Sequence, residues 1–181
     1  TTSDELFYRH ANDKQLARLG AARTAAAAGR VLPAAAGVGL AVWAKPDSLA
    51  RAAGIESSLG HYQDYYREFA FDGNDQTFFW SDRGLQPGDH VTLTLDQPTR
   101  FRSLVLHLGT QRYRNEYIHD GLIEISCDGR QWTELGKLDT SRHAFDLPAM
   151  PVKSIRLRSL AAQRFWLIIR EIELVNSKQR G

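Results

Sequence analysis

Cysteine is almost absent from this sequence, because Cys127 is the only one among 181 residues. An intramolecular disulfide therefore cannot form, which excludes a fold held together by disulfide bridges. Cys127 closes the alternating segment 123–127, and at that position we expect a small buried thiol and not a nucleophile.

Charge of one sign and long apolar runs are also scarce. The chain has 23 Lys and Arg against 21 Asp and Glu, a formal net charge of +2, and no run of consecutive basic residues. The most apolar segment, 31–44, is interrupted by Pro33 and is shorter than the roughly 20 residues that a transmembrane helix needs. We therefore expect no nucleic-acid partner and no membrane span.

Sequence motifs of common enzymes are missing as well. The six histidines are scattered without an HExxH pair, and GxSxG, GxGxxG and P-loop patterns do not occur. Glu134 and Asp139 are the acids that best imitate the two carboxylates of a glycosidase, but acidic side chains on hairpins are usually solvated. We expect that this chain is not itself an enzyme.

The first 60 residues differ in composition from the rest. A capping box at 2–5 precedes an alanine-rich segment, which predicts a helix that ends near Gly29. A second helix is predicted between Asp47, a suitable N-cap, and Gly54, which would stop it. The sequence therefore predicts a helical N-terminal segment.

From Gly88 onward the apolar spacing changes to a period of two. Segments of strand length alternate or run apolar at 91–95, 103–108, 122–126, 154–160 and 165–175. Turn signals separate them, and Asp128–Gly129 predicts a tight hairpin. This pattern predicts an antiparallel β-sandwich. The predicted organisation is a helical segment 1–60, a linker 61–70 that leads into the first strand, the sandwich 71–176 and a tail 177–181.

A short polar run precedes the aromatic residues 78–80. Asp72, Asn74 and Thr77 supply carboxylate, amide and hydroxyl oxygens around Gly73, and Ca²⁺ takes such hard donors at about 2.3–2.6 Å. The same residues are typical of an Asx-turn, in which Asp72 and Asn74 accept hydrogen bonds from nearby backbone amides. A structural cation and a plain turn both stay open on these residues alone.

The same run begins a resemblance that continues along the chain. The motifs are, in order, D-G-N-x-x-T followed by Trp-Ser (72–81), GDHVTLTL (88–95), IEISCDGRQWTELG (123–136) and REIELV (170–175). Together they resemble the discoidin or coagulation factor 5/8 type C family, whose bacterial members include the family 32 carbohydrate-binding modules. The resemblance implies a mainly β fold, a discoidin-like jelly-roll sandwich preceded by a short α-helical segment. Animal members usually carry a disulfide, so this chain is more similar to the bacterial type.

The resemblance implies one structural calcium ion. Members of the family hold it with the Asp-Gly-Asn-x-x-Thr loop and a glutamate of the closing strand. Carried over to this sequence, the ligands are Asp72, Asn74, Thr77 and Glu171. A cation would also partner the Glu171 carboxylate, which falls on the same face of the closing strand as the apolar Leu167 and Ile169.

The resemblance also implies a sugar site at the loop end of the sandwich. Galactose-binding relatives carry an aromatic platform five residues before the closing-strand glutamate, where this chain has Trp166. The loop 110–117 offers Arg112, Tyr113, Arg114, Asn115 and Glu116 in one exposed run, and such side chains can bond sugar hydroxyls. Two alternatives stay open: Trp166 as a core residue and the loop as an ordinary solvated loop. Trp80 matches the family's core tryptophan.

The function implied by the resemblance is a non-catalytic carbohydrate-binding module that targets a bacterial glycosidase, secreted or on the cell surface, to glycans. The expected sugar is of the galactose or N-acetylhexosamine type. The arginine that galactose binders carry after the strand 103–109 is replaced by Thr110-Gln111, and 117–126 looks like modules attached to bacterial β-N-acetylglucosaminidases and hyaluronidase-like enzymes. The alternatives are a structural module that docks on a covalently linked catalytic domain, and the C-terminal fragment of a glycoside hydrolase.

Overall fold

A computed structural model describes residues 52–74 and 76–176 of the chain. The helix predicted to end near Gly29 and the tail predicted at 177–181 lie outside the described residues.

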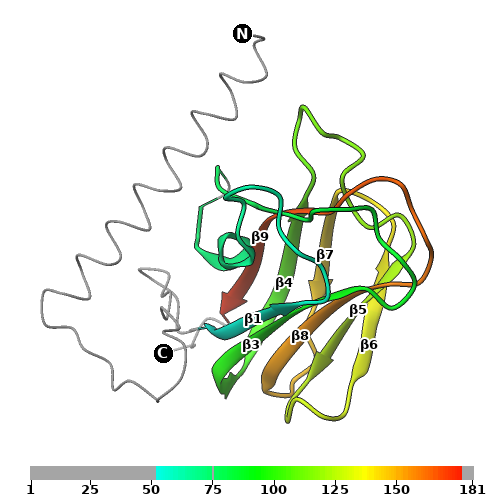
Figure 1. The fold of residues 1–181 in the computed structure, drawn as a ribbon. Coiled ribbons are helices and arrows are strands. Elements are labelled where there is room, and N and C mark those ends of the chain that lie inside the picture. The colour runs from blue at the N-terminus through cyan, green and yellow to red at the C-terminus, as the bar shows by residue number, and fades with distance from the viewer. Residues whose placement is uncertain (1–51, 75, 177–181) are drawn as a thin grey trace, which may run out of the picture. The chain divides into compact units, whose positions relative to one another are not determined.

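The described residues form a sandwich of two antiparallel sheets (Figure 1). The five-stranded sheet has the order β1 (Ala52–Ser57), β3 (His90–Thr99), β8 (Val152–Ser159), β5 (Gly121–Ser126) and β6 (Thr133–Leu138). The four-stranded sheet has the order β2 (Phe79–Trp80), β9 (Ile168–Asn176), β4 (Phe101–Leu108) and β7 (Arg142–Asp146). A short 3₁₀ helix, η1 (Arg67–Phe71), lies in the long connection between β1 and β2. The predicted β-sandwich is therefore confirmed.

The core between the sheets follows from the period of two in the sequence. Alternate residues of a strand face opposite sides, so the apolar member of each pair can point into the core. In β3 these are Val91, Leu93 and Leu95, all 0% exposed, and β4, β5 and β8 repeat the pattern. The strands predicted at 91–95, 103–108, 122–126 and 154–160 are all present.

Strand β1 corrects the prediction of a helix between Asp47 and Gly54. Ala52 and Ala53 belong to β1, which pairs antiparallel with β3 through Ile55 and Leu93. Helix propensity is overridden here because β1 completes the edge of the sheet and buries Ile55. The part of the predicted helix before Ala52 lies outside the described residues.

Three further expectations differ from the structure. The segment predicted as a strand from Phe165 becomes β9 only at Ile168. Strand β7 has no counterpart in the prediction, and β6 is predicted only as the second arm of the hairpin at Asp128–Gly129, because both are edge strands with mostly exposed or half-buried side chains. Cys127 is exposed and not buried, because β5 ends at Ser126 and the thiol lies at the start of the hairpin turn.

The hairpin turn itself agrees with the sequence. Gly129 has φ 76°, a conformation that suits glycine, and the Asp128 carboxylate accepts hydrogen bonds from the backbone N–H groups of Arg130 and Gln131 at 2.8 and 2.9 Å.

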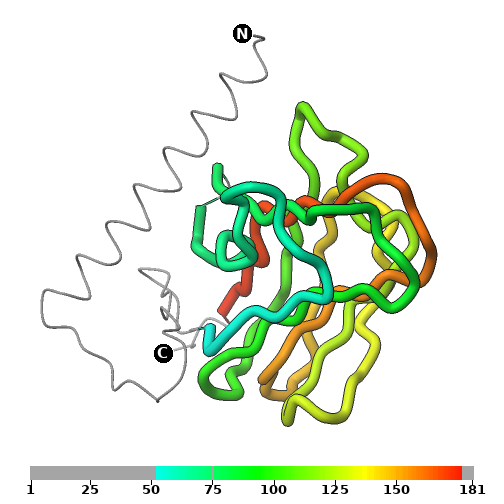
Figure 2. Tube along the Cα trace, in the orientation of Figure 1, coloured from blue at the N-terminus to red at the C-terminus, as the bar shows by residue number. Residues whose placement is uncertain are grey.

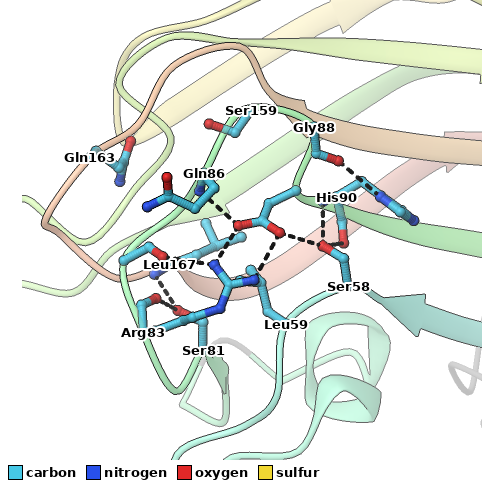
Figure 3. Close-up of polar contacts among 12 residues, drawn as sticks. Ser58, Leu59, Ser81, Arg83, Gln86, Gly88, His90, Ser159, Gln163 and Leu167 are labelled. Carbon is cyan, nitrogen blue, oxygen red and sulfur yellow. Dashed lines mark hydrogen bonds and ion pairs between the residues drawn. The ribbon is translucent and has the colours of Figure 1, made fainter.

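A polar cluster around Asp89 fixes the loop before β3 to the end of β1 (Figure 3). The Asp89 carboxylate is buried and accepts two hydrogen bonds from Arg83, at 2.6 and 3.0 Å. It also accepts from the Gln86 backbone N–H at 2.7 Å and from the Ser58 hydroxyl at 2.9 Å. Loops that lie far apart in the sequence are thereby held at one end of the sandwich.

The loop between β4 and β5 projects from the sandwich (Figure 2). Gly109, with φ 59°, begins it, and its N–H donates to the carbonyl of Ile168 at the start of β9. The Ile168 N–H in turn donates to the carbonyl of Glu116 at 2.9 Å. The loop is therefore anchored to the segment that carries Trp166.

Candidate functional site

Six aromatic rings form a cluster at the loop end of the sandwich. We call it the aromatic cluster; its members are Tyr62, Tyr65, Phe78, Trp80, Tyr113 and Trp166. Trp80 lies at its centre, with ring centroids 5.1 Å from Tyr62, 4.8 Å from Tyr113 and 5.8 Å from Trp166. Trp80 is only 6% exposed, so its prediction as a core residue is confirmed.

Trp166, the predicted platform, lies at the edge of this cluster. It is half-buried and meets Tyr62 edge-on with centroids 5.4 Å apart. Its position two residues before β9 allows the ring to leave the sheet, while Leu167 and Ile168 enter the core. The ring is held by its neighbours and keeps part of its surface accessible, as a stacking platform requires.

The polar residues predicted from the loop 110–117 divide into two groups. Tyr113 is half-buried against Trp80, and burial, assisted by the nearby Glu116 carboxylate, raises its pKa. The exposed Arg112 guanidinium lies 5.7 Å from the centroid of the Tyr113 ring. Tyr113 and Arg112 therefore lie near Trp166, because Trp80 contacts both Tyr113 and Trp166.

Arg114 and Asn115 instead make contacts along their own loop. Arg114 Nε donates to the carbonyl of Gln111 at 3.0 Å. The backbone oxygen of Asn115 lies 2.8 Å from Nε2 of His119. Both side chains are exposed.

Glu116, the last polar candidate of the loop, is partly buried and not exposed as the sequence suggested. Burial raises the pKa of its carboxyl group, and the N–H groups of the Trp166 backbone and the Trp80 indole offset this only in part. Its Oε2 atom is buried and has no hydrogen-bond partner among the described residues. A carboxylate oxygen in this position can accept a hydrogen bond from a bound hydroxyl group. No local pattern in the sequence predicts this burial.

A second aromatic stack joins the same two loops. The rings of Tyr117 and His119 lie 4.3 Å apart, and those of His119 and Phe165 lie 5.1 Å apart, both pairs with an interplanar angle of 13°. The Gln163 side chain accepts from the His119 backbone N–H at 2.9 Å and donates to the carbonyl of Tyr117 at 2.8 Å. This stack holds the 109–120 and 160–167 loops in a fixed relation.

The four predicted metal ligands also come together, around the loop that follows η1. The Thr77 hydroxyl donates to Asp72 Oδ2 at 2.6 Å and accepts from Asn74 Nδ2 at 3.0 Å. Glu171, 6% exposed, accepts from the Gly73 backbone N–H at 2.9 Å through Oε2. The Asn74 N–H donates to Asp72 Oδ1 at 2.9 Å, which is an Asx-turn.

The chemistry of this donor set fits calcium. Two carboxylates, an amide, a hydroxyl and backbone carbonyls are hard oxygen ligands, and they converge on one loop that the positive φ of Gly73, 79°, folds back on itself. In 52–74 and 76–176 no group of three or more His, Cys, Asp or Glu side chains is placed to hold a metal, so any ion here would depend on the neutral oxygens as well.

The fold and its loop-end site define the class of protein. It is an antiparallel β-sandwich that displays an aromatic cluster and polar loops at one end. The model of the F5/8 type C domain family matches residues 54–172. The chain belongs to the F5/8 type C domain family. No match was found among curated proteins.

Solved structures share the fold at low sequence identity. CBM32-1 from a family 31 glycoside hydrolase of Clostridium perfringens has a TM-score of 0.58 and 16% identity, covering 68% of this chain and 93% of that one. Chitosan-binding module 2 of a chitosanase/glucanase from Paenibacillus sp. IK-5, solved with chitotriose, has a TM-score of 0.57 and 18% identity, with 68% and 95% covered.

A third similar structure contains the CBM32-1 and CBM32-2 domains of Clostridium perfringens ZmpB in complex with GalNAc. Its TM-score is 0.58 and its identity 14%, with 71% of this chain and 35% of that one covered. None of the helical residues that the structure describes forms a segment long and apolar enough to cross a membrane.

Proposed function

We propose that this chain is a non-catalytic carbohydrate-binding module and that it binds a sugar of the galactose or N-acetylhexosamine type at the loop end. One observation carries the proposal. Trp166 is half-buried in the aromatic cluster, and the Glu116 carboxylate, whose pKa burial raises, lies beside it. An aromatic face and a desolvated hydrogen-bond acceptor side by side suit the apolar face and the hydroxyl groups of a pyranose.

The proposed roles differ among the loop residues. Trp166 stacks on the sugar ring, while Glu116 accepts a hydrogen bond from a sugar hydroxyl. Tyr113 and Arg112 border the site, because Tyr113 packs on Trp80 and Arg112 lies over Tyr113. Arg114 and Asn115, which bond their own loop, contribute less to affinity. Similar modules that are reported with GalNAc and chitotriose support a sugar as the ligand class.

The proposal includes a structural calcium ion. Asp72, Asn74, Thr77 and Glu171 would hold it, and bound Ca²⁺ would supply positive charge that joins the loop to β9. The same side chains are also linked by hydrogen bonds, from Thr77 to Asp72, from Asn74 to Thr77 and from the Gly73 N–H to Glu171. The ion would stabilise the fold and would take no part in sugar recognition.

The wider setting is also a proposal. The module would be covalently linked to a catalytic domain of a bacterial glycosidase, secreted or on the cell surface, and would raise the enzyme's effective concentration on glycans. The alternative of a docking module loses one argument. Tyr65, whose ring a docked domain would have to contact, is 0% exposed and stacks on Phe78 in the aromatic cluster, with ring centroids 4.6 Å apart.

Isothermal titration with galactose, N-acetylgalactosamine, N-acetylglucosamine and lactosamine tests the proposed site. We expect one of these sugars to bind the wild type and Trp166→Ala to weaken its binding about tenfold or more, a loss of roughly 1.4 kcal/mol. Leu160→Ala is the matched control. Leu160 is 39% exposed, so its substitution removes apolar surface outside the aromatic cluster. Equal binding by both variants and the wild type would contradict the proposed platform.

A further inference from the structure

A groove of about 440 Å³ lies on the outer face of the five-stranded sheet. It crosses β1, β3 and β8, which are neighbours in the sheet (Figure 1), and the turn of the β5–β6 hairpin borders it. It shares no residue with the aromatic cluster. Its volume falls within the roughly 300–1,000 Å³ that is usual for ligand sites.

The floor of this groove consists of hydroxyl groups. Thr92 and Thr94 alternate with the buried core residues of β3, so they point away from the core and into the groove. Ser154 of β8 joins them, with its Oγ atom 3.3 Å from Thr94 Oγ1. Hydroxyl groups both donate and accept hydrogen bonds, which matches a ligand that carries hydroxyl groups of its own.

One wall of the groove is aromatic and held in place. The indole of Trp132 is half-buried, and the Arg156 guanidinium lies over its ring, 4.1 Å from the ring centroid, in a cation–π contact. Arg156 is in turn fixed by Glu124, because its Nε donates to Glu124 Oε2 at 2.8 Å. That bond uses one of the five guanidinium donors. The ring orientation is therefore set before any ligand arrives, which lowers the entropy cost of binding.

The charges that line the groove balance one another. Lys153 and Arg156 face Glu56 and Asp128, which gives no net formal charge with neutral His90. Lys153 already donates to the carbonyls of Leu95 and Asp96, at 2.6 and 2.9 Å. A polyanion such as a sulfated or pectic chain would meet acids as well as bases here, so the balance favours an uncharged ligand.

We propose that this groove is a second glycan-binding site that takes a neutral oligosaccharide chain. Neighbouring strands lie about 4.7–4.9 Å apart, so the distance from β1 to β8 is roughly 10 Å, wider than one pyranose ring. The site differs from the proposed loop-end site in position and in ligand, because this span admits more than a single terminal sugar. The inference stands whether or not the loop-end site binds a sugar.

The test is isothermal titration of the full chain with cellohexaose, xylohexaose and the N-acetylglucosamine hexamer, and with the galacturonate hexamer as polyanion. We expect one neutral hexasaccharide to bind, Trp132→Ala to weaken that binding about tenfold or more, and Thr92→Arg to abolish it by filling the floor. Ser103→Arg, on β4 of the other sheet, is the matched control and should bind as the wild type does. Circular dichroism verifies that each variant is folded.

If Trp132→Ala does not fold, Thr92→Arg still tests the proposed groove, because Thr92 is half-buried and lies on the outer face of β3. Trp166→Ala separates the two sites, because hexasaccharide binding that persists in this variant and is lost in Thr92→Arg belongs to the groove, whereas its effect on monosaccharides reports on the loop-end site. The inference is overturned if no neutral hexasaccharide binds, if only the galacturonate hexamer binds, or if binding survives Thr92→Arg.

Discussion

Replacing Asp89 with alanine should be one of the most destabilising single changes to a polar residue of the sandwich. The Asp89 side chain is 9% exposed and accepts four hydrogen bonds, two of them from the guanidinium group of Arg83. The other two come from the Gln86 backbone N–H and the Ser58 hydroxyl, so the carboxylate joins the loop 83–89 to the end of β1 (Figure 3). Its loss leaves all of these donors without their acceptor.

The magnitude follows from what each donor can do afterwards. Removing one partner of a buried ion pair typically costs about 3–5 kcal/mol. Arg83 is 45% exposed and can return to water, and Gln86 and Ser58 are exposed as well, so the lower end applies. We expect Asp89→Ala to lower the free energy of unfolding by about 3 kcal/mol. Arg83→Ala, which leaves the carboxylate its other two donors, should cost about 1 kcal/mol.

The pH dependence provides an independent check. Burial alone would raise the pKa of Asp89, but the hydrogen bonds from Arg83, Gln86 and Ser58 hold it below its ordinary value. A depressed pKa gives stability that is present above the unfolded value of about 3.9 and is lost as the pH falls through the folded value. Urea unfolding at pH 7 and at pH 3 should therefore show a smaller difference between wild type and Asp89→Ala at pH 3. A difference that stays below 1 kcal/mol at pH 7, or grows on acidification, would refute the reasoning.

Three further predictions concern the metal loop, the core and the buried acid of the site. Calcium should raise the melting temperature of the wild type, and a chelator should lower it. The melting temperature of Glu171→Gln should respond to neither, because this variant lacks one proposed ligand. Equal responses of both proteins would argue against the proposed ion. Gly121→Ala should cost about 2 kcal/mol or more in urea unfolding, because the added Cβ would meet Ile118 and lie 2.6 Å from the carbonyl of Arg158. Glu116→Gln should be more stable than the wild type at pH 7 and similar at pH 4, because an acid with a raised pKa loses its stabilising contribution as the pH rises; a less stable variant at pH 7 would be the opposite result.

Much of the sandwich could be predicted because its central strands carry their own pattern. In the first part of β3 and in most of β4 every second residue is buried and apolar, and this alternation is visible without any structure. Strand β1 could not be found in this way, since its alanine and glycine residues favour no strand and only pairing with β3 makes it one. The edge strands β6 and β7 bury too few residues on one face to show a period.

The candidate site was predictable only in part, for a related reason. The predicted metal ligands Asp72, Asn74 and Thr77 lie within one short loop, so their spacing is local and can be recognised. The proposed role of Glu116 depends on Trp80 and Trp166, which come from other segments and create the burial that raises its pKa. Contacts between distant segments leave no mark in a single sequence, so the sequence offers Glu116 as one polar residue of the loop but does not predict its burial.

The central claim is that a sugar binds against Trp166 at the loop end. Nuclear magnetic resonance of the indole N–H groups during titration with N-acetylgalactosamine, followed by the other three sugars, tests it most directly. We expect a saturable shift of the Trp166 resonance with one of these sugars and no shift of the Trp132 resonance. The Trp132 indole lies on the outer face of the five-stranded sheet, away from the aromatic cluster. A Trp166 resonance that stays unchanged with all four sugars would contradict the account.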